Sequence, residues 1–121
     1  MPALEQVVVS LDEHVATVML NRPEQRNPLS ATMLGDLATA FRWCQKEPEV
    51  RVVVLTGAGD RVFCAGADLA GFDGEMTHLE RHRSRNLFVE LFTLMAGLGK
   101  PIVGRINGHA LAGGIGLACA C

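Results

Sequence analysis

The sequence predicts a single α/β domain in which parallel strands alternate with helices. Runs rich in β-branched residues have the length of buried strands, and they lie at 7–10, 15–20, 50–56 and 102–106. Apolar residues at steps of three and four fall between the later runs, the spacing of amphipathic helices. Because strand, crossover helix and strand form a right-handed parallel unit, this order predicts parallel pairing.

The chain begins with a predicted hairpin. The runs Val7–Ser10 and Val15–Leu20 are separated by the polar residues 12–14, which favours two adjacent antiparallel strands. A polar segment follows at 21–28, and its two prolines predict a loop without regular structure.

The first predicted helix begins after Ser30, a residue type that caps helix N-termini well. Five apolar residues then recur on one helical face: Met33, Leu34, Leu37, Phe41 and Cys44. Pro48 ends this helix because proline cannot continue it. The stripe predicts that one side of the helix packs on the sheet.

The second half continues the alternation of strands and helices. We expect a buried strand at 50–56 and a turn at 57–60. A helix is predicted over 77–96, with an apolar stripe made by Leu87, Leu91, Leu94 and Met95. A strand at 102–106 precedes a third helix that starts near Gly113.

Composition excludes several classes of protein. Hydrophobic residues make up 49% and charged residues 20%, which excludes intrinsic disorder. The net charge of -2, aromatic content of 5% and lack of tyrosine argue against a nucleic-acid partner. Four cysteines without metal-ligand spacing predict reduced thiols and no metal site. With no signal peptide and no apolar run long enough to span a bilayer, we expect a cytoplasmic protein without a membrane partner.

Two segments of small residues could carry chemistry. They lie at 64–68 and 107–114, and each follows a predicted strand. Small side chains let a ligand approach the backbone, and two N–H groups that converge on one oxygen form an oxyanion hole. The alternative is close packing of loops and helices without any ligand.

Motifs in five places give the chain a resemblance to the crotonase (enoyl-CoA hydratase/isomerase) superfamily, from about residue 5 onward. They are Asn21-Arg22-Pro23 with Asn27-Pro28-Leu29-Ser30, Val53-Val54-Leu55-Thr56-Gly57, Phe63-Cys64-Ala65-Gly66-Ala67-Asp68-Leu69, Lys100-Pro101-Ile102-Val103, and Asn107-Gly108 with Ala112-Gly113-Gly114. The resemblance implies a crotonase-like spiral of ββα units, of which residues 1–121 would be one incomplete core domain, the N-terminal part. It also implies an enzyme acting on an acyl-CoA thioester.

The resemblance assigns roles to individual residues. The backbone N–H groups of Ala67 and Gly113 match the family's two oxyanion donors and are the catalytic candidates. Residues implied to bind the substrate are Gln25, Arg26, Ala65, Gly66, Asp68, Leu69 and Gly114. No cofactor is expected beyond the coenzyme A carried by the substrate. Full-length proteins of this family would be homo-oligomers, trimers or hexamers.

One position departs from the family pattern. Hydratases of the family carry a catalytic glutamate three residues after the second oxyanion donor, where this chain has Gly116. A second family glutamate would lie beyond residue 121. We therefore expect the 121-residue chain alone to be inactive. The alternative function is a non-catalytic module that binds CoA thioesters, or a truncated remnant.

Two other basic features have plain interpretations. His109 is expected to face solvent or a neighbouring strand. Arg81, Arg83 and Arg85 are spaced by two on a predicted helix, so they spread around it and are expected to be solvated. Of the basic residues, Arg26 is the preferred candidate for a phosphate of the substrate.

Overall fold

An antiparallel hairpin opens the fold of the computed structural model, which describes residues 1–67 and 78–121. Strand β1 (Val7–Asp12) pairs with β2 (Val15–Leu20) along its whole length. Glu13 and His14 connect them with φ values of 44° and 70°, the left-handed turn backbone that matches the twist of a hairpin. The predicted hairpin is confirmed, with a first strand that runs on to Asp12.

Two parallel strands complete the main sheet. Strand β3 (Val52–Gly57) pairs with β2, and β5 (Ile102–Arg105) pairs with β3. The strand order is β1-β2-β3-β5, which confirms the predicted parallel pairing. Val50 is buried but precedes β3. The backbone hydrogen bonds between this segment and the turn of the first hairpin begin one residue later, where the Arg51 N–H donates to the His14 carbonyl (2.9 Å).

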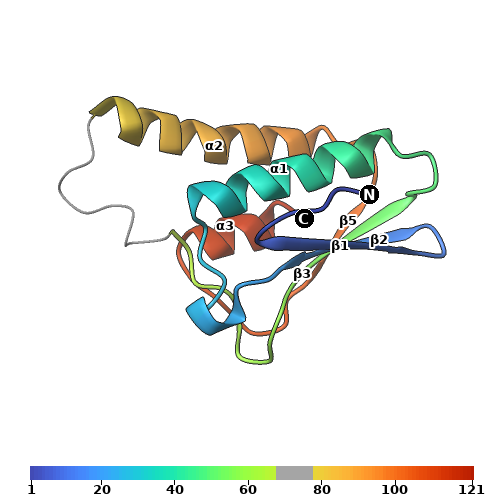
Figure 1. Ribbon diagram of the computed structural model, residues 1–121, viewed down its shortest axis with the longest axis horizontal. Helices are drawn as coiled ribbons and strands as arrows, with labels where there is room; N and C mark the ends of the chain where they lie inside the picture. The colour runs from blue at the N-terminus through green and yellow to red at the C-terminus, as the bar shows by residue number, and fades with distance from the viewer. Residues whose placement is uncertain (68–77) are drawn as a thin grey trace.

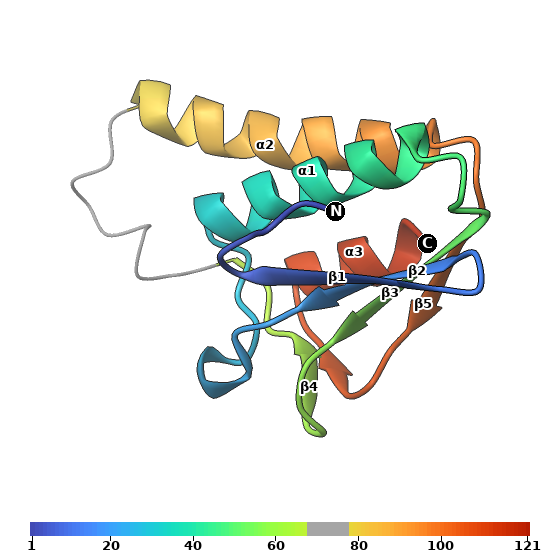
Figure 2. The same ribbon diagram turned by 45° about the vertical axis from the view of Figure 1, so that its right-hand side comes forward.

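Helices cover one face of this sheet (Figures 1 and 2). They are α1 (Ala31–Lys46), α2 (His78–Ala96) and α3 (Gly113–Cys119). The Ser30 hydroxyl accepts a hydrogen bond from the Met33 N–H at 3.0 Å, so the predicted N-cap of α1 is confirmed.

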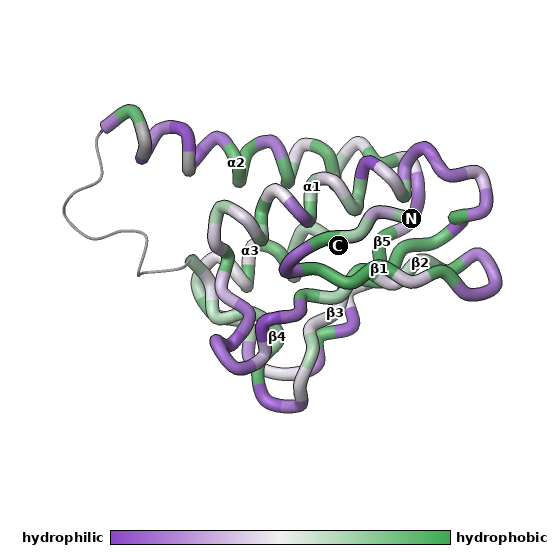
Figure 3. The backbone as a smooth tube through the Cα atoms, viewed as in Figure 1, coloured by the Kyte–Doolittle hydropathy of each residue, from purple (hydrophilic) through white to green (hydrophobic). Residues whose placement is uncertain are grey.

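The core lies between the sheet and these helices. All five residues of the predicted α1 stripe are buried, and in α2 Leu91 and Met95 are buried while Leu87 and Leu94 are partly buried. The N-terminal half of α2 extends past α1 and is largely hydrophilic (Figures 1 and 3). Arg81, Arg83 and Arg85 are exposed there, as expected.

A lysine closes the C-terminal end of α1. The Lys100 ammonium, from the loop before β5, donates to the carbonyls of Cys44 (2.6 Å) and Glu47 (2.8 Å). Carbonyls at a helix C-terminus lack intrahelical partners and carry partial negative charge, so this contact joins α1 to the α2–β5 connection.

Three short elements were not predicted. Strands β4 (Val62–Cys64) and β6 (His109–Ala110) form a small parallel sheet. Their lengths are too short for an alternating pattern to emerge in sequence. The prediction of no regular structure over 21–28 is wrong for one turn, the 3-10 helix η1 (Pro23–Gln25). Proline is tolerated at its first position because that N–H has no helical partner.

Two features are absent from the part of the chain that the structure describes. None of the described helices is both long and apolar enough to cross a membrane. Within the same ranges, no three His, Cys, Asp or Glu residues lie together as a metal site requires.

Candidate functional site

The two small-residue segments lie side by side. The Leu111 N–H donates to the Cys64 carbonyl at 3.0 Å, which joins the end of β4 to the segment before α3. A Cβ on Gly114 would overlap the Cys64 carbonyl, so only glycine lets the first turn of α3 approach this closely. Gly114, the second residue of α3, therefore lies directly against the end of β4.

Gly66 brings the segments closest together. It has φ +96°, and a Cβ built there would lie 2.8 Å from the Leu111 oxygen, 3.0 Å from the Ala112 Cβ and 3.3 Å from the Gly113 nitrogen. Both the backbone conformation and the space require glycine at this position. Its carbonyl accepts from the Leu29 N–H at 2.7 Å, which anchors the segment to the start of α1.

Ala67 and Gly113 are neighbours in space. A Cβ built on Gly113 would lie 3.9 Å from the Ala67 nitrogen. Among the hydrogen bonds of the described residues, none has the N–H of either residue as its donor. Ala112 precedes Gly113 with φ 48° and ψ -118°, a conformation that is costly for a residue with a side chain. Two adjacent N–H groups with no acceptor in the described part of the chain are suited to bind one electron-rich oxygen.

Apolar side chains lie beside the Gly113 end of this pair of N–H groups. The Gly113 Cβ position is 3.4 Å from Leu29 Cδ1 and 3.5 Å from Phe88 Cε1. One turn further along α3, the Gly116 Cβ position is 3.4 Å from Phe92 Cζ. The two phenylalanine rings have centroids 6.2 Å apart and are tilted by 47°. Low polarity strengthens any hydrogen bond made here.

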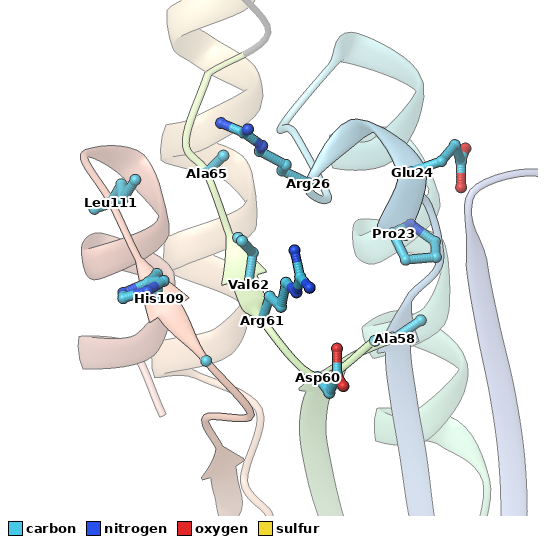
Figure 4. Close-up of a pocket in the computed structure, with 12 residues that line it drawn as sticks. Pro23, Glu24, Arg26, Ala58, Asp60, Arg61, Val62, Ala65, His109 and Leu111 are labelled. Atoms are coloured by element: carbon cyan, nitrogen blue, oxygen red, sulfur yellow. The ribbon is translucent and has the colours of Figure 1, made fainter.

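A pocket of about 860 Å³ adjoins the same segments. Its walls come from Pro23, Glu24 and Arg26, from the turn 58–62 with Ala65, and from Gly108, His109 and Leu111. Arg26 extends towards Ala65, while Glu24 points away from the pocket (Figure 4). Ala65 and Leu111 lie two residues before Ala67 and Gly113, so the pocket leads towards the paired N–H groups.

Two asparagines join the pocket walls. Asn27 is fully buried, accepts from the Arg22 N–H (2.8 Å) and donates to the carbonyls of Ala58 and Phe63 (3.1 Å each). Asn107 accepts from the Gly57 N–H and donates to the Gly59 carbonyl, each at 3.0 Å.

The structure places the predicted residues in three groups. Arg26 and Ala65 line the pocket, and Gly66, Ala67 and Gly113 lie at the paired N–H groups. Gln25 is exposed on η1 outside the pocket lining, and Gly114 is buried against Cys64. Substrate contacts by these two residues stay predictions. Asp68 and Leu69 lie outside the described residues.

Sequence reasoning gave no role to Arg61, and it gave none to Asn27 although that residue stands in one of the motifs of the resemblance. Arg61 lies in the predicted turn after β3, where charged residues are commonplace, so no local signal distinguishes it. The available signal for Asn27 was its residue type, because asparagine tolerates the left-handed backbone found here (φ 52°). His109 is exposed, as expected, but it also lines the pocket.

Cys64, at the junction of the two segments, is buried. Burial raises the pKa of this thiol, and a hydrogen bond from the Gly66 backbone opposes the shift. The side chain is therefore a neutral thiol near pH 7, and it serves as packing rather than as a nucleophile.

Comparisons with known proteins agree on one family. Residues 10–121 match the family described as Enoyl-CoA hydratase/isomerase. The crotonyl-CoA hydratase of Syntrophomonas wolfei is 33% identical over 98% of this chain and 45% of the relative. The short-chain-enoyl-CoA hydratase of Clostridium acetobutylicum is 34% identical over 98% of this chain and 45% of the relative.

Solved structures show the same likeness. The crystal structure of an enoyl-CoA hydratase from Bacillus anthracis superposes with a TM-score of 0.91 at 36% identity, over 97% of this chain and 45% of that one. The fold is therefore the crotonase-like α/β arrangement that the motifs implied. The chain spans less than half the length of these relatives.

Proposed function

The chain belongs to the enoyl-CoA hydratase/isomerase family, and we propose that it stabilises the enolate form of an acyl-CoA thioester in a backbone oxyanion hole. The observation that carries this proposal is the position of Ala67 beside Gly113, with the Gly113 Cβ site 3.9 Å from the Ala67 nitrogen. Both N–H groups lack an acceptor among the described residues. A thioester oxygen placed between them would accept two hydrogen bonds.

The chemistry follows from where charge develops. Removing a proton next to a thioester carbonyl, or adding water across the adjacent double bond, moves negative charge onto the carbonyl oxygen. Donors already in place stabilise that charge without reorganising, and losing one donor of this kind usually costs about 2.7–4 kcal/mol. Hydration or isomerisation of an enoyl-CoA is the reaction class that we propose for a protein of the relatives' length.

The adjoining pocket supports a place for the CoA carrier. It holds the guanidinium of Arg26 and leads past Ala65 towards the paired N–H groups. Guanidinium groups bind phosphate oxygens well, and a phosphorylated carrier in the pocket would extend its thioester towards Ala67 and Gly113. We propose no cofactor besides this carrier.

Binding of a conjugated thioester tests the oxyanion hole. The absorption band of cinnamoyl-CoA moves to longer wavelength when its carbonyl oxygen accepts strong hydrogen bonds. We expect the chain to bind this compound and produce that shift. Gly66→Ala should remove the shift, because its Cβ would lie 2.8 Å from the Leu111 oxygen in a backbone with φ +96°.

Gly35→Ala is the matched control, since nothing lies within 4 Å of its Cβ position. It should keep both binding and the spectral shift. Cinnamoyl-CoA that binds the unaltered chain without any shift would refute the oxyanion hole.

The second candidate is a module that binds CoA thioesters without catalysis, and Gly116 favours it. This residue carries no acid or base, and its Cβ position faces the Phe92 ring at 3.4 Å. That distance is an ordinary contact for a Cβ, so Gly116→Ala should fold. If the module is non-catalytic, the unaltered chain binds crotonyl-CoA but shows no hydration, and measurable hydration at 263 nm would eliminate it.

For a protein of the relatives' length we also propose a cytoplasmic homo-oligomer, a trimer or a hexamer, with no nucleic-acid or membrane partner. Native mass spectrometry tests the assembly directly. A monomer at micromolar concentration would contradict the proposed assembly and leave the oxyanion hole unaffected.

A further inference from the structure

The main sheet has a face that none of the described helices covers (Figures 1 and 2). Alternate side chains of each strand point to this face, because successive residues of a strand point to opposite sides of a sheet. The strand pairing sets these residues in three rows. The rows are Asp12, Val15 and Val52; Ser10, Thr17, Val54 and Val103; and Val8, Met19, Thr56 and Arg105. We call this set of residues the open sheet face.

Much of the open sheet face is apolar. Three of its valines are exposed, Val8 by 42%, Val15 by 36% and Val103 by 51%. Val52 and Val54 lie on β3, between the strands of Val15 and Val103, and are partly buried. A single exposed valine is ordinary, but valines on three neighbouring strands form a contiguous apolar patch. Such a patch is typical of a surface that binds another molecule.

The two charged residues of the open sheet face lie at opposite corners. Asp12 ends the first row on β1, and Arg105 ends the last row on β5. Three strand spacings of about 4.8 Å and four residue steps of about 3.3 Å separate these corners, so the distances across and along the strands are nearly equal. Both residues are exposed, and within residues 1–67 and 78–121 neither forms an ion pair.

Opposite charges at opposite corners suit a two-fold contact between identical sheets. When two copies pack face to face, the two-fold axis lies between them, in the plane of the contact. An axis along the other diagonal, which starts at Val8, brings Asp12 of each copy to Arg105 of the other. Because this diagonal runs at about 45° to the strands, the strands of the two copies cross at about 90°, one of the two arrangements in which sheets pack.

The same two-fold axis also matches the apolar residues. It places Val52 of one copy beside Val103 of the other, and it brings the two copies of Val8 together on the axis. The valines thus lie between two ion pairs, one at each end of the contact. A partner of uniform charge, such as an anionic lipid surface, would complement only one of the two corners.

We infer that the open sheet face is a contact between two copies of this chain, related by a two-fold axis, with Asp12 of each copy paired to Arg105 of the other. The face measures roughly 14 Å by 13 Å, which is small for a specific interface, so we expect a dissociation constant in the micromolar range. The inference does not rest on the proposed oxyanion hole. Two-fold contacts occur in a hexamer built from two trimers facing each other and not in a single trimer.

Sedimentation equilibrium of the 121-residue chain tests this contact. The unaltered chain should reach twice its 13.0 kDa mass as its concentration rises. Arg105→Glu places two carboxylates together at both ends of the contact and should weaken the dimer by about tenfold or more. Asp12→Arg should weaken it in the same way. Arg42→Glu is the matched control, because it makes the same charge reversal at an exposed position on α1, and it should leave the dimer unchanged.

Exchanging the two charges tests the pairing itself. The double variant Asp12→Arg with Arg105→Glu restores opposite charges at both ends of the contact and keeps the net charge of the unaltered chain. It should therefore regain the affinity that each single variant loses. Neither a loss of folding nor a general effect of net charge would produce this recovery, and circular dichroism of each variant checks that the fold is kept.

Three results would overturn the inference. The first is an unaltered chain that stays monomeric at millimolar concentration. The second is an oligomer whose affinity Arg105→Glu does not change, because another surface would then form the contact. The third is a double variant that associates as weakly as the single variants. Each of these results would leave the proposed oxyanion hole standing, since none of the altered residues belongs to it.

Discussion

Replacing Lys100 by methionine removes the ammonium that closes the C-terminal end of α1. Methionine keeps the length and much of the apolar stem of lysine but has no donor. The change deletes two short hydrogen bonds, to the carbonyls of Cys44 (2.6 Å) and Glu47 (2.8 Å). Both carbonyls lie at the end of α1, where intrahelical partners run out.

The expected loss of stability is about 2–3 kcal/mol. A hydrogen bond to a charged group contributes about 1.5–3 kcal/mol, and a cation at a helix C-terminus about 0.3–1 kcal/mol. These contributions overlap because one ammonium makes all of them, so the sum of two full bonds is an overestimate. For a domain of this size the loss corresponds to a fall in melting temperature of roughly 10 °C.

The chain supplies its own control, since Lys46 is the other lysine of the sequence and lies in the same last turn of α1. It is exposed, and among the described residues its ammonium makes no ion pair. Lys46→Met should cost less than about 0.5 kcal/mol. Urea unfolding followed by circular dichroism measures both variants, and equal losses would refute the capping role of Lys100.

The pKa of the Cys44 thiol distinguishes loss of the Lys100 charge from a general loss of packing. Burial raises the pKa of the Cys44 thiol from 9.0 to about 11, and the Lys100 charge partly opposes that shift. Lys100→Met should therefore raise the pKa of Cys44 further. Thiolate absorption near 240 nm follows the titration, and the absence of tyrosine leaves that region clear of phenolate.

Three further predictions follow from local contacts. The pKa of Cys44 is higher in the folded chain than in the unfolded chain, so the stabilisation that the buried thiol gives is complete below pH 9.0 and is lost as pH rises towards about 11. Urea titrations should show the free energy of unfolding fall by an amount on the order of 2 kcal/mol over this range. A free energy of unfolding that does not change with pH would contradict the buried thiol. Ser30→Ala should destabilise the chain by about 1 kcal/mol through loss of the α1 cap, whereas the exposed Ser10→Ala should be neutral; equal melting temperatures would refute the cap. Gly113→Ala should fold and keep the cinnamoyl-CoA shift, because its Cβ meets Leu29 and Phe88 only at 3.4 Å and 3.5 Å and the N–H remains; loss of the shift with binding intact would count against the site geometry.

Local chemistry explains the parts of the fold that could be predicted. Ser30 caps α1 through a bond to a residue three positions away, and the α1 stripe repeats at helical spacing, so both are visible in a short window. The longer strands have enough β-branched residues to stand out. Strands β4 and β6 have three and two residues, too few for any periodic signal, and long-range pairing alone creates them.

In the candidate site, too, some residues could be predicted from the sequence and others could not. The resemblance to the crotonase superfamily implied roles for Gly66, Ala67 and Gly113, and the physical reason for glycine at 66 is a backbone with positive φ pressed against Leu111. Asn27 and Arg61 lie 34 positions apart in the sequence, and no pattern within either segment relates them.

The order of strands and helices, the cap of α1 and the small-residue segments are all encoded in neighbouring residues, where hydrogen bonds and side-chain periodicity act over a few positions. The pocket depends instead on three segments that are far apart in the sequence, at 23–26, 58–65 and 108–111. Asn27 and Asn107 reach the turn of Arg61 from segments 80 positions apart. Contacts across such separations are set by the packing of the whole chain, so the folded structure was needed to identify Arg61 as a residue of the site.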